Sequence, residues 1–341
     1  MEFRAFGNTP LRVSEIGFGC SHISGSLHHK SDKEVLSILL QAFDRGVNFY
    51  DTADVYAQGR SERLLGEAFR NNRKDVIIAT KAGYRATTAG KVVAKLKPLL
   101  RPLFSVTKGA NTRAQRTQGT WGAQNFSPDY IRRAIDRSLR RMKTDYIDVF
   151  QLHSPSREII EMGESITALE DARTQGKIRW YGVSCRAIED AALCLGHPGI
   201  SSVQIPINLL EFKGVSSLLA LAAQKGVGVI ARQPLASGYL AQPLALVNKK
   251  PFSAEKEKFK EKLEQARAFQ FLGHADGRTI AQAAINFVLG LSGVSVVIAG
   301  MSSQRHLLEN LAAPLSHLTQ DEMARIYAVL DQELIETHGN A

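Results

Sequence analysis

Four side chains suited to moving a proton follow closely on apolar runs that are typical of β-strands. Asp51 ends the run VNFYD, Tyr56 lies five residues later, Lys81 follows DVIIAT, and His153 follows YIDVFQL. Each of these residues alone is more often a structural hydrogen-bonding group, so the inference rests on their occurring together. A nearby ammonium stabilises a phenolate and lowers the phenol pKa from about 10, and a carboxylate keeps that ammonium charged and in place. With an imidazole to orient a substrate oxygen, the set predicts proton delivery to an oxygen that gains negative charge.

This chemistry needs a source of electrons, which none of the four side chains supplies. The sequence contains neither a nucleophile elbow nor a zinc-ligand spacing, and a hydride-donating cofactor is the natural supplement. The stretch GFGCSH holds only two glycines of the G-x-G-x-x-G fingerprint, so a Rossmann site is disfavoured.

Bringing strand ends together requires a particular fold, and the pattern of the chain predicts one. Strand-like runs alternate with amphipathic helical segments, and the runs lie at 14–19, 47–51, 75–80, 146–152, 179–184, 201–207, 226–232 and 295–300. Eight such units over about 250 residues are what a (β/α)8 TIM barrel requires, with catalytic groups at the carboxyl ends of the strands. A doubly wound open sheet is the alternative, and it fits the number of regular units less well.

A barrel of this kind binds phosphate with the loops after its seventh and eighth strands. Here those loops read RQPLASGYL and AGMSSQRHLLENL. The second places Gly300, Ser302 and Ser303 at the opening of a helix, with Arg305 in its first turn. This arrangement suits an anion, and it is equally compatible with a plain serine N-cap and a solvated arginine.

Other segments add detail to this α/β architecture. EFRAF and LRVSE flank GNTP, which predicts an N-terminal β-hairpin that could close the bottom of the barrel. In SPDYIRRAIDRSLRRM, Ser127 is the expected N-cap and Pro128 the first helical residue. Two connections, 82–126 and about 233–277, are too long for simple loops, although SAEKEKFKEKLEQARAF in the second has the pattern of an exposed helix. We expect one domain over 1–341, with long loops on the catalytic face.

The composition limits the function classes that need considering. The 341-residue chain is 44% hydrophobic with a net charge of +10, and no apolar run approaches the roughly 20 residues that span a bilayer. The start MEFRAFGNTP lacks an apolar segment of signal-peptide type, and three cysteines are too few for a disulfide scaffold, so we expect a cytoplasmic protein. Between Ala82 and Thr120 lie eight lysines and arginines without an acidic residue. This segment is interpreted as a solvated loop, with attraction of an anionic substrate as an alternative; nucleic-acid binding is disfavoured because aromatic residues are sparse there.

On these motifs the chain resembles the aldo-keto reductases over nearly its whole length, from GNTPLRVSEIGFG to the LLENL helix. The resemblance is carried by VNFYDTADVYAQGRSERLLGEA, IIATKAG, YIDVFQLH, YGVSC and PLASGYL. Members of that family have a (β/α)8 barrel with an N-terminal hairpin and catalyse the reversible NAD(P)H-dependent reduction of aldehydes and ketones. The resemblance implies that Tyr56 is the general acid, that Lys81 and Asp51 tune it, and that His153 orients the carbonyl.

The resemblance also implies a cofactor site and no metal. Ser184 and Gln204 match positions that bind the nicotinamide carboxamide, Cys185 stands where the family usually has asparagine, and Arg232 stands where an aromatic ring often stacks on the nicotinamide. Further matches are Leu235, Ser237 and Gly238 in the pyrophosphate loop, Gly300, Ser302 and Arg305 near the 2′-phosphate, and Glu309 and Asn310 at the adenine. A guanidinium plane can stack on a ring, so Arg232 is compatible with nicotinamide binding.

Cofactor and substrate follow from the same resemblance. NADP(H) is favoured because Arg305 can supply charge to a 2′-phosphate, although GMSS also resembles sugar-dehydrogenase relatives that accept NAD(H). His22 and Trp121 are candidate substrate contacts, and we expect the insertion at 82–126, which begins beside Lys81, to form a lid with Trp121 as a wall residue.

The predicted function is therefore reduction of a small-molecule aldehyde or ketone, without a nucleic-acid or membrane partner. One alternative is a sugar or alcohol dehydrogenase that works mainly in the oxidative direction with NAD. The other is a cofactor-binding regulatory subunit without turnover, as some barrel relatives of channels are.

Overall fold

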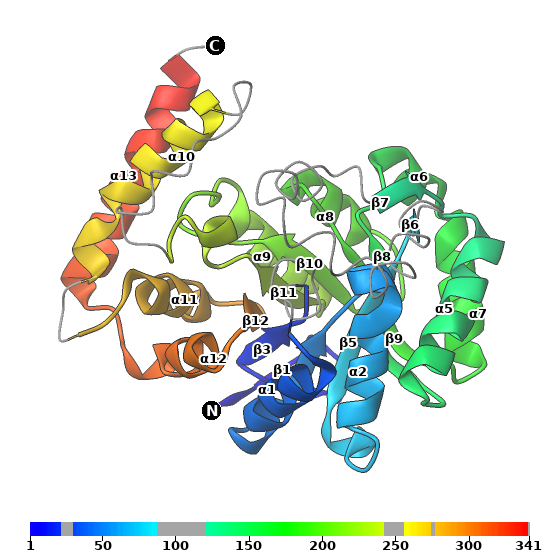
Figure 1. Ribbon diagram of the computed structural model, residues 1–341. Coiled ribbons are helices and arrows are strands. Elements are labelled where there is room, and N and C mark those ends of the chain that lie inside the picture. The colour runs from blue at the N-terminus through cyan, green and yellow to red at the C-terminus, as the bar shows by residue number, and fades with distance from the viewer. Residues whose placement is uncertain (22–29, 87–120, 242–255, 274–276, 340–341) are drawn as a thin grey trace. The chain divides into compact units, whose positions relative to one another are not determined.

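The computed structural model of the chain describes residues 1–21, 30–86, 121–241, 256–273 and 277–339 (Figure 1). Eight strands form a closed barrel, namely β3 (Ile16–Gly19), β4 (Phe49–Asp51), β5 (Ile77–Ala82), β8 (Ile147–His153), β9 (Ile178–Ser184), β10 (Ser202–Pro206), β11 (Gly228–Arg232) and β12 (Val294–Gly300). Each of the eight predicted strand runs overlaps one of these strands. The predicted (β/α)8 barrel is therefore confirmed.

The chain divides into two compact units. The β4–β9 unit holds 19–185 and 196–200, and the β10–β12 unit holds 1–18, 186–195 and 201–341. The expectation of a single domain over the whole chain stays a prediction.

The helices described in the β4–β9 unit differ in how they begin. They are α1 (Asp32–Asp44), α2 (Arg60–Ala68), α5 (Pro128–Met142), α6 (Arg157–Met162) and α7 (Glu164–Thr174), with 3₁₀ turns η1 (Tyr56–Gly59) and η2 (Arg73–Asp75). At α1, the Ser31 hydroxyl accepts from the Glu34 N–H and the Glu34 carboxylate accepts from the Ser31 N–H, a capping box. At α5, Ser127 is the N-cap residue and Pro128 comes first in the helix as predicted, although the Ser127 hydroxyl makes no capping bond.

Strand register in this unit decides which side chains share a face. Asp51 pairs with Ala79, Lys81 with Gln151, and His153 with Ser184 along parallel strands. Paired residues in parallel strands point to the same side, as do residues two apart in one strand, so Asp51, Lys81, His153 and Ser184 share one face. The alternate residues point at the helices instead, since the Thr80 hydroxyl donates to Glu62 of α2 at 2.7 Å. The predicted catalytic side chains therefore lie on the face that is turned away from the helices.

In the β10–β12 unit, the predicted hairpin is confirmed and its position is defined. Strand β1 (Phe3–Ala5) pairs antiparallel with β2 (Arg12–Ser14). The turn between them contains Gly7, where φ is +56° and an added Cβ would meet the Gly226 carbonyl oxygen at 2.4 Å, so glycine is required there. The Arg4 guanidinium donates to the Leu289 carbonyl at 2.8 Å, just before β12. The hairpin thus packs at the amino ends of β11 and β12.

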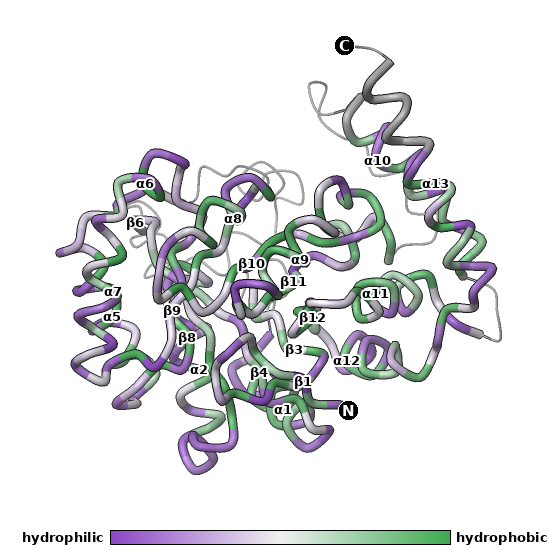
Figure 2. Tube along the Cα trace, turned by 180° about the vertical axis from the view of Figure 1, so that it is seen from behind, coloured by the Kyte–Doolittle hydropathy of each residue, from purple (hydrophilic) through white to green (hydrophobic). Residues whose placement is uncertain are grey.

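The helices of this unit are α8 (Ile188–Cys194), α9 (Val215–Lys225), α10 (Lys256–Ala268), α11 (Ile280–Gly290), α12 (Gln304–Leu311) and α13 (Gln320–Gly339), and its 3₁₀ turns are η5 (Ala236–Gly238), η7 (Gln270–Gly273) and η8 (Ala313–Leu315). Helix α11, with the sequence IAQAAINFVLG, is mostly apolar and has many buried side chains (Figure 2). The helix predicted from SAEKEKFKEKLEQARAF is α10, which lies beside α13 in both views (Figures 1 and 2).

The long connection at 82–126 is more ordered at its ends than the sequence indicated. Strand β6 (Tyr84–Ala86) pairs antiparallel with β7 (Trp121–Gln124) to form a two-stranded sheet, called here the β6–β7 ribbon. Gly83 enters this ribbon with φ +148°, and an added Cβ would lie 2.4 Å from the Phe126 ring. The ribbon therefore begins two residues after the end of β5, the strand that holds Lys81.

Candidate active site

The centre of the candidate site is a buried ion pair between neighbouring strands. Lys81 Nζ donates to both carboxylate oxygens of Asp51, each at 2.7 Å, and to the Thr52 carbonyl oxygen at 2.8 Å. The Lys81 side chain is 1% exposed and that of Asp51 is 5% exposed. A buried charge is tolerated only when it is paired and hydrogen-bonded, so the three acceptors explain how the ammonium stays charged there. Thr52 was missed by the sequence analysis because it acts through its backbone.

Tyr56 and His153 complete the tetrad. The Lys81 ammonium lies 5.3 Å from the centroid of the Tyr56 ring. The Tyr56 and His153 rings have centroids 6.0 Å apart and planes at 85°. His153 is buried, and the Tyr56 residue is partly exposed. The four side chains that the sequence singled out therefore lie together in the β4–β9 unit.

The backbone after Tyr56 is strained. Ala57 has φ +46°, Gln58 has φ +60°, and Gly59 follows with φ +85°. A left-handed conformation costs an L-residue about 1–2 kcal/mol, and such strain is concentrated at functional sites. This turn lies directly before α2, which begins at Arg60.

Asp54 is a second carboxyl near the tetrad, only partly exposed, that the sequence analysis did not single out. Its N–H donates to the Lys81 carbonyl at 3.0 Å, which ties the loop before Tyr56 to strand β5. Its Oδ1 atom is buried and has no hydrogen-bond partner among the residues that the structure describes. Burial, reinforced by the nearby Glu62 carboxylate, raises the pKa of Asp54 to about 7 against the opposing effect of Arg141 and Arg137. Asp54 therefore titrates near neutrality, two residues away from the predicted proton donor.

Ser184 and Cys185 are the predicted cofactor contacts of the β4–β9 unit. Ser184 lies opposite His153 in the register of β8 and β9 and is buried. The Cys185 thiol is buried and lies 4.0 Å from the Val183 carbonyl oxygen, as a weak hydrogen bond. Ser184 is thus beside the tetrad, whereas the Cys185 thiol is turned toward its own strand.

The other predicted cofactor residues form two groups in the β10–β12 unit. In the loop after β11, Arg232 donates to the Gln233 side chain at 2.5 Å and Gln233 donates to the Ser237 hydroxyl at 3.1 Å. Gln233 was missed, although it lies between two predicted residues. Leu235 accepts from the Gly238 N–H at 2.8 Å, and Gln233, Ala236 and Ser237 all have positive φ. These contacts fix a tight, polar turn at the carboxyl end of β11.

The second group surrounds the start of α12. Ser303 caps the helix by accepting from the His306 N–H, and the Ser302 hydroxyl lies 3.1 Å from His306 Nδ1. The Asn310 side chain donates to the Gly300 carbonyl at 3.3 Å, so these two predicted residues are in contact. The first turn of α12 holds no acidic residue, and Arg305 is exposed there. Glu309 is partly exposed, and Gln204 is buried on β10 opposite Ile230 of β11.

Two predicted substrate contacts receive no test. His22 lies outside the described residues, and so does most of the predicted lid, at 87–120. The backbone of Trp121 opens β7, and its side chain is outside the described part of the chain.

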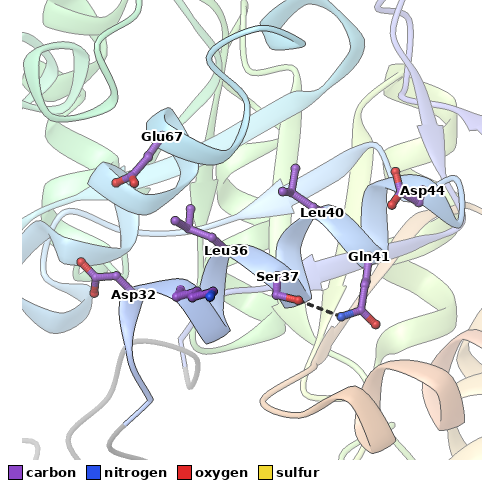
Figure 3. Close-up of a pocket in the computed structure, with 8 residues that line it drawn as sticks. Asp32, Leu36, Ser37, Leu40, Gln41, Asp44 and Glu67 are labelled. Carbon is purple, nitrogen blue, oxygen red and sulfur yellow. Dashed lines mark hydrogen bonds between the residues drawn. The ribbon is translucent and has the colours of Figure 1, made fainter.

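A groove elsewhere in the β4–β9 unit does not contribute to this chemistry. It is lined by Asp32, Lys33, Leu36, Ser37, Leu40, Gln41 and Asp44 of α1 and by Glu67 of α2 (Figure 3). The Gln41 amide donates to the Ser37 hydroxyl at 3.0 Å, and none of the tetrad residues lines the groove. In the described ranges, no cluster of three or more His, Cys, Asp or Glu residues could hold a metal, and none of the helices is long and apolar enough to cross a bilayer.

A closed parallel barrel with Asp, Lys and His at strand ends, and Tyr in the connection after β4, is typical of one class of oxidoreductase, and comparison with known proteins identifies the family. The aldo/keto reductase family model matches residues 15–331, so the chain belongs to that family. It is an NAD(P)H-dependent oxidoreductase that interconverts carbonyl and alcohol groups.

Three similar proteins illustrate the family. The chain is 29% identical over 347 residues to the uncharacterized oxidoreductase YqkF of Bacillus subtilis, covering 99% of each chain. It is 27% identical to L-galactose dehydrogenase of Arabidopsis thaliana, covering 97% of this chain and 95% of that protein. Among solved structures, the holo form of aldo-keto reductase AKR11C1 from Bacillus halodurans is 28% identical, with a TM-score of 0.75 over 96% of each chain.

Proposed function

We propose that this protein reduces a small-molecule aldehyde or ketone with NADP(H) in preference to NAD(H), and that Tyr56 delivers the proton. The observation that carries the proposal is the three-acceptor coordination of a buried Lys81 ammonium 5.3 Å from the Tyr56 ring. A cation held there favours the phenolate over the phenol and so makes Tyr56 a stronger acid. Asp51 has the supporting role of keeping Lys81 charged and fixed.

His153 supplies the second polar contact for the substrate. An imidazole N–H that is directed at the carbonyl oxygen fixes the oxygen near the Tyr56 hydroxyl and stabilises its developing charge. The nicotinamide cofactor supplies the hydride when it is bound. As the carbonyl carbon accepts the hydride, the oxygen takes the Tyr56 proton, and Lys81 stabilises the phenolate that remains.

The residues of the β10–β12 unit fit a dinucleotide phosphate. The turn at Arg232, Gln233 and Ser237 offers a guanidinium and a hydroxyl to an anion. The eight-residue helix α12 begins with a serine cap and an exposed Arg305, which favours an anion at its amino end. We propose that Arg305 binds the 2′-phosphate, which NADP(H) has and NAD(H) lacks, and that this contact causes the preference for NADP(H). Leu235, Gly238, Gly300, Ser302, Glu309 and Asn310 complete the proposed contacts in this unit, and Ser184 is proposed for the carboxamide.

Oxidation of a sugar or alcohol is the second candidate function. The similarity to L-galactose dehydrogenase over 97% of the chain favours it. The same four residues serve both directions, because Tyr56 in its phenolate form accepts the proton that it donates in reduction. A cytoplasmic location is part of the proposal, and it rests on the odd number and low content of cysteine.

The test is a screen of aldehydes, ketones, sugars and alcohols, followed through the absorbance of the reduced nicotinamide with each cofactor. Tyr56→Phe should lower kcat by about 10²- to 10⁴-fold, the usual contribution of a general acid. Tyr146→Phe is the matched control, because this tyrosine is flanked by Arg73 and Arg179 and touches none of the tetrad. Undiminished turnover in Tyr56→Phe refutes the role of Tyr56, and consumption of a single equivalent of NADPH supports a regulatory subunit. Equal rates with NADH refute the cofactor preference, and Arg305→Ala should raise KM for NADPH alone.

A further inference from the structure

The β6–β7 ribbon is attached to the strand end that carries His153. The Gln124 side chain donates to the Ser154 carbonyl at 2.7 Å, and Ser154 directly follows His153. Ser154 has φ +56°, and its N–H donates to the Ser184 carbonyl at 2.8 Å. The ribbon therefore holds a strained residue next to the imidazole in place.

Tyr84 of the ribbon contacts the imidazole itself. The Tyr84 and His153 ring centroids lie 5.0 Å apart with planes at 87°, which is closer than the 6.0 Å between His153 and Tyr56. An edge-to-face pair at this separation is the favoured geometry for two rings. The His153 imidazole is thus in contact with two tyrosine rings, of which only Tyr56 belongs to the tetrad.

The position of Tyr84 is fixed independently of His153. Tyr84 is 6% exposed and pairs with Gln124 across the ribbon. The Tyr84 carbonyl oxygen accepts a hydrogen bond from the Tyr130 hydroxyl at 2.6 Å. Tyr130 belongs to α5, so Tyr84 is anchored to a helix as well as to β7. A residue whose backbone is held from two sides and whose side chain is buried can restrict a neighbouring side chain, whereas a loosely held residue would move with it.

We infer that Tyr84 is a positioning residue for His153 and that the β6–β7 ribbon holds Tyr84 and Ser154 in the arrangement that orients the imidazole. The inference rests on the proposed function, because it assigns Tyr84 a role only if His153 orients the substrate oxygen. The ring of Tyr84 fixes the plane of the imidazole, so that its N–H points at the carbonyl oxygen. The phenol hydroxyl of Tyr84 has no part in this role.

Two substitutions separate the ring from the hydroxyl. Tyr84→Phe keeps the ring and should leave kcat within about twofold of the original, whereas Tyr84→Leu should lower kcat by about two- to tenfold, the worth of one aromatic pair. KM should change little in either variant, because the substrate still binds but is less well oriented. A fall in kcat that is equal in both variants, or a change confined to KM, overturns the inference.

A control distinguishes positioning from loss of stability. Tyr181→Leu removes another buried tyrosine, whose hydroxyl bonds Glu170 of α7 on the helix-facing side of β9. Tyr181→Leu should lower the denaturation midpoint while leaving kcat of the folded protein unchanged. If Tyr84→Leu behaves like Tyr181→Leu in both measurements, Tyr84 is a packing residue and the inference fails.

A spectroscopic measurement does not depend on turnover. In protein with isotope-labelled histidine, the ring resonance of His153 is the one that His153→Gln abolishes. Tyr84→Leu should shift that resonance, because it removes the ring current of a ring 5.0 Å away, and Tyr84→Phe should shift it far less. An unshifted resonance in Tyr84→Leu refutes the contact even in a protein without activity. A shifted resonance together with an inactive wild-type protein retains the contact and refutes the proposed function instead.

Discussion

The ion pair between Asp51 and Lys81 allows stability and catalysis to be tested separately. Three variants are needed, namely Asp51→Asn, Lys81→Met and the two changes combined. Both single variants leave one buried charge without its partner, since the side chains are 5% and 1% exposed. The combined variant contains neither charge, and its side chains have volumes similar to the originals.

The magnitude follows from the geometry. At the observed 2.7 Å and an effective dielectric constant of about 20, the attraction is about 6 kcal/mol, and removing water from the two ions costs several kcal/mol each. Each single variant should therefore lose about 3–5 kcal/mol of unfolding free energy, because a charge is left buried and uncompensated. The combined variant should lose only about 0–2 kcal/mol, the larger value reflecting the lost bond to the Thr52 carbonyl.

Activity should follow a different order. All three variants lack the ammonium, the carboxylate that holds it, or both, so all should turn over carbonyl substrates far more slowly than the original protein. Urea unfolding at pH 7 measures the free energies, and reduced-nicotinamide absorbance measures turnover. An unfolding free energy in Lys81→Met equal to that of the original protein would contradict the expected cost of leaving the Asp51 charge unpaired. If the combined variant recovers turnover as well as stability, Tyr56 does not depend on the ammonium.

Two further predictions concern the loop between Asp51 and α2. Because burial raises the pKa of Asp54 to about 7, the folded state keeps a proton that the unfolded state releases near pH 4, so unfolding free energy should fall as pH rises from about 4 to about 7. Asp54→Asn should flatten this pH dependence and raise the unfolding free energy by about 1–3 kcal/mol at pH 8, less than the full pKa shift implies because the residue keeps some exposure. Urea titrations across this pH range measure the unfolding free energy. An unchanged pH dependence in the variant would exclude Asp54 as its cause. Ala57→Gly should relieve the positive φ at residue 57 and raise stability by about 0.5–1 kcal/mol after the greater entropy of unfolded glycine is subtracted. Ala57→Val should lower the urea midpoint, and a midpoint that falls in Ala57→Gly would show that the turn is not strained.

The barrel and the tetrad could be predicted because both depend on short-range pattern. Each strand is a compact apolar run, and a residue that follows such a run must lie at the carboxyl end of the strand. Asp51, Lys81 and His153 were found in this way, and the register places them on one face. Parallel pairing then turned three separate sequence positions into one cluster without any information about loops.

Features that depend on unpatterned segments could not be predicted in this way. The positive φ at Ala57 is invisible because alanine is not a residue that favours a left-handed turn. The β6–β7 ribbon joins two short segments across an insertion, and its register shifts between Tyr84 and Ala86, so no regular alternation marks it. The Oδ1 atom of Asp54 has no hydrogen-bond partner within the described ranges, which depends on what surrounds it after folding, and its neighbours Glu62 and Arg141 come from α2 and α5.

These unpredicted features share one consequence for the chemistry. Asp54 donates its N–H to the Lys81 carbonyl, Ala57 directly follows Tyr56, and Tyr84 contacts the His153 ring. Each of them therefore contacts or adjoins a member of the tetrad from outside the barrel strands, which supply only the approximate positions. A proton transfer depends on tenths of an ångström in the donor–acceptor distance, and strand register alone does not fix side chains to that accuracy. We therefore propose that the barrel strands bring the four groups together and that the segments that follow β4 and β5 align them for the reaction.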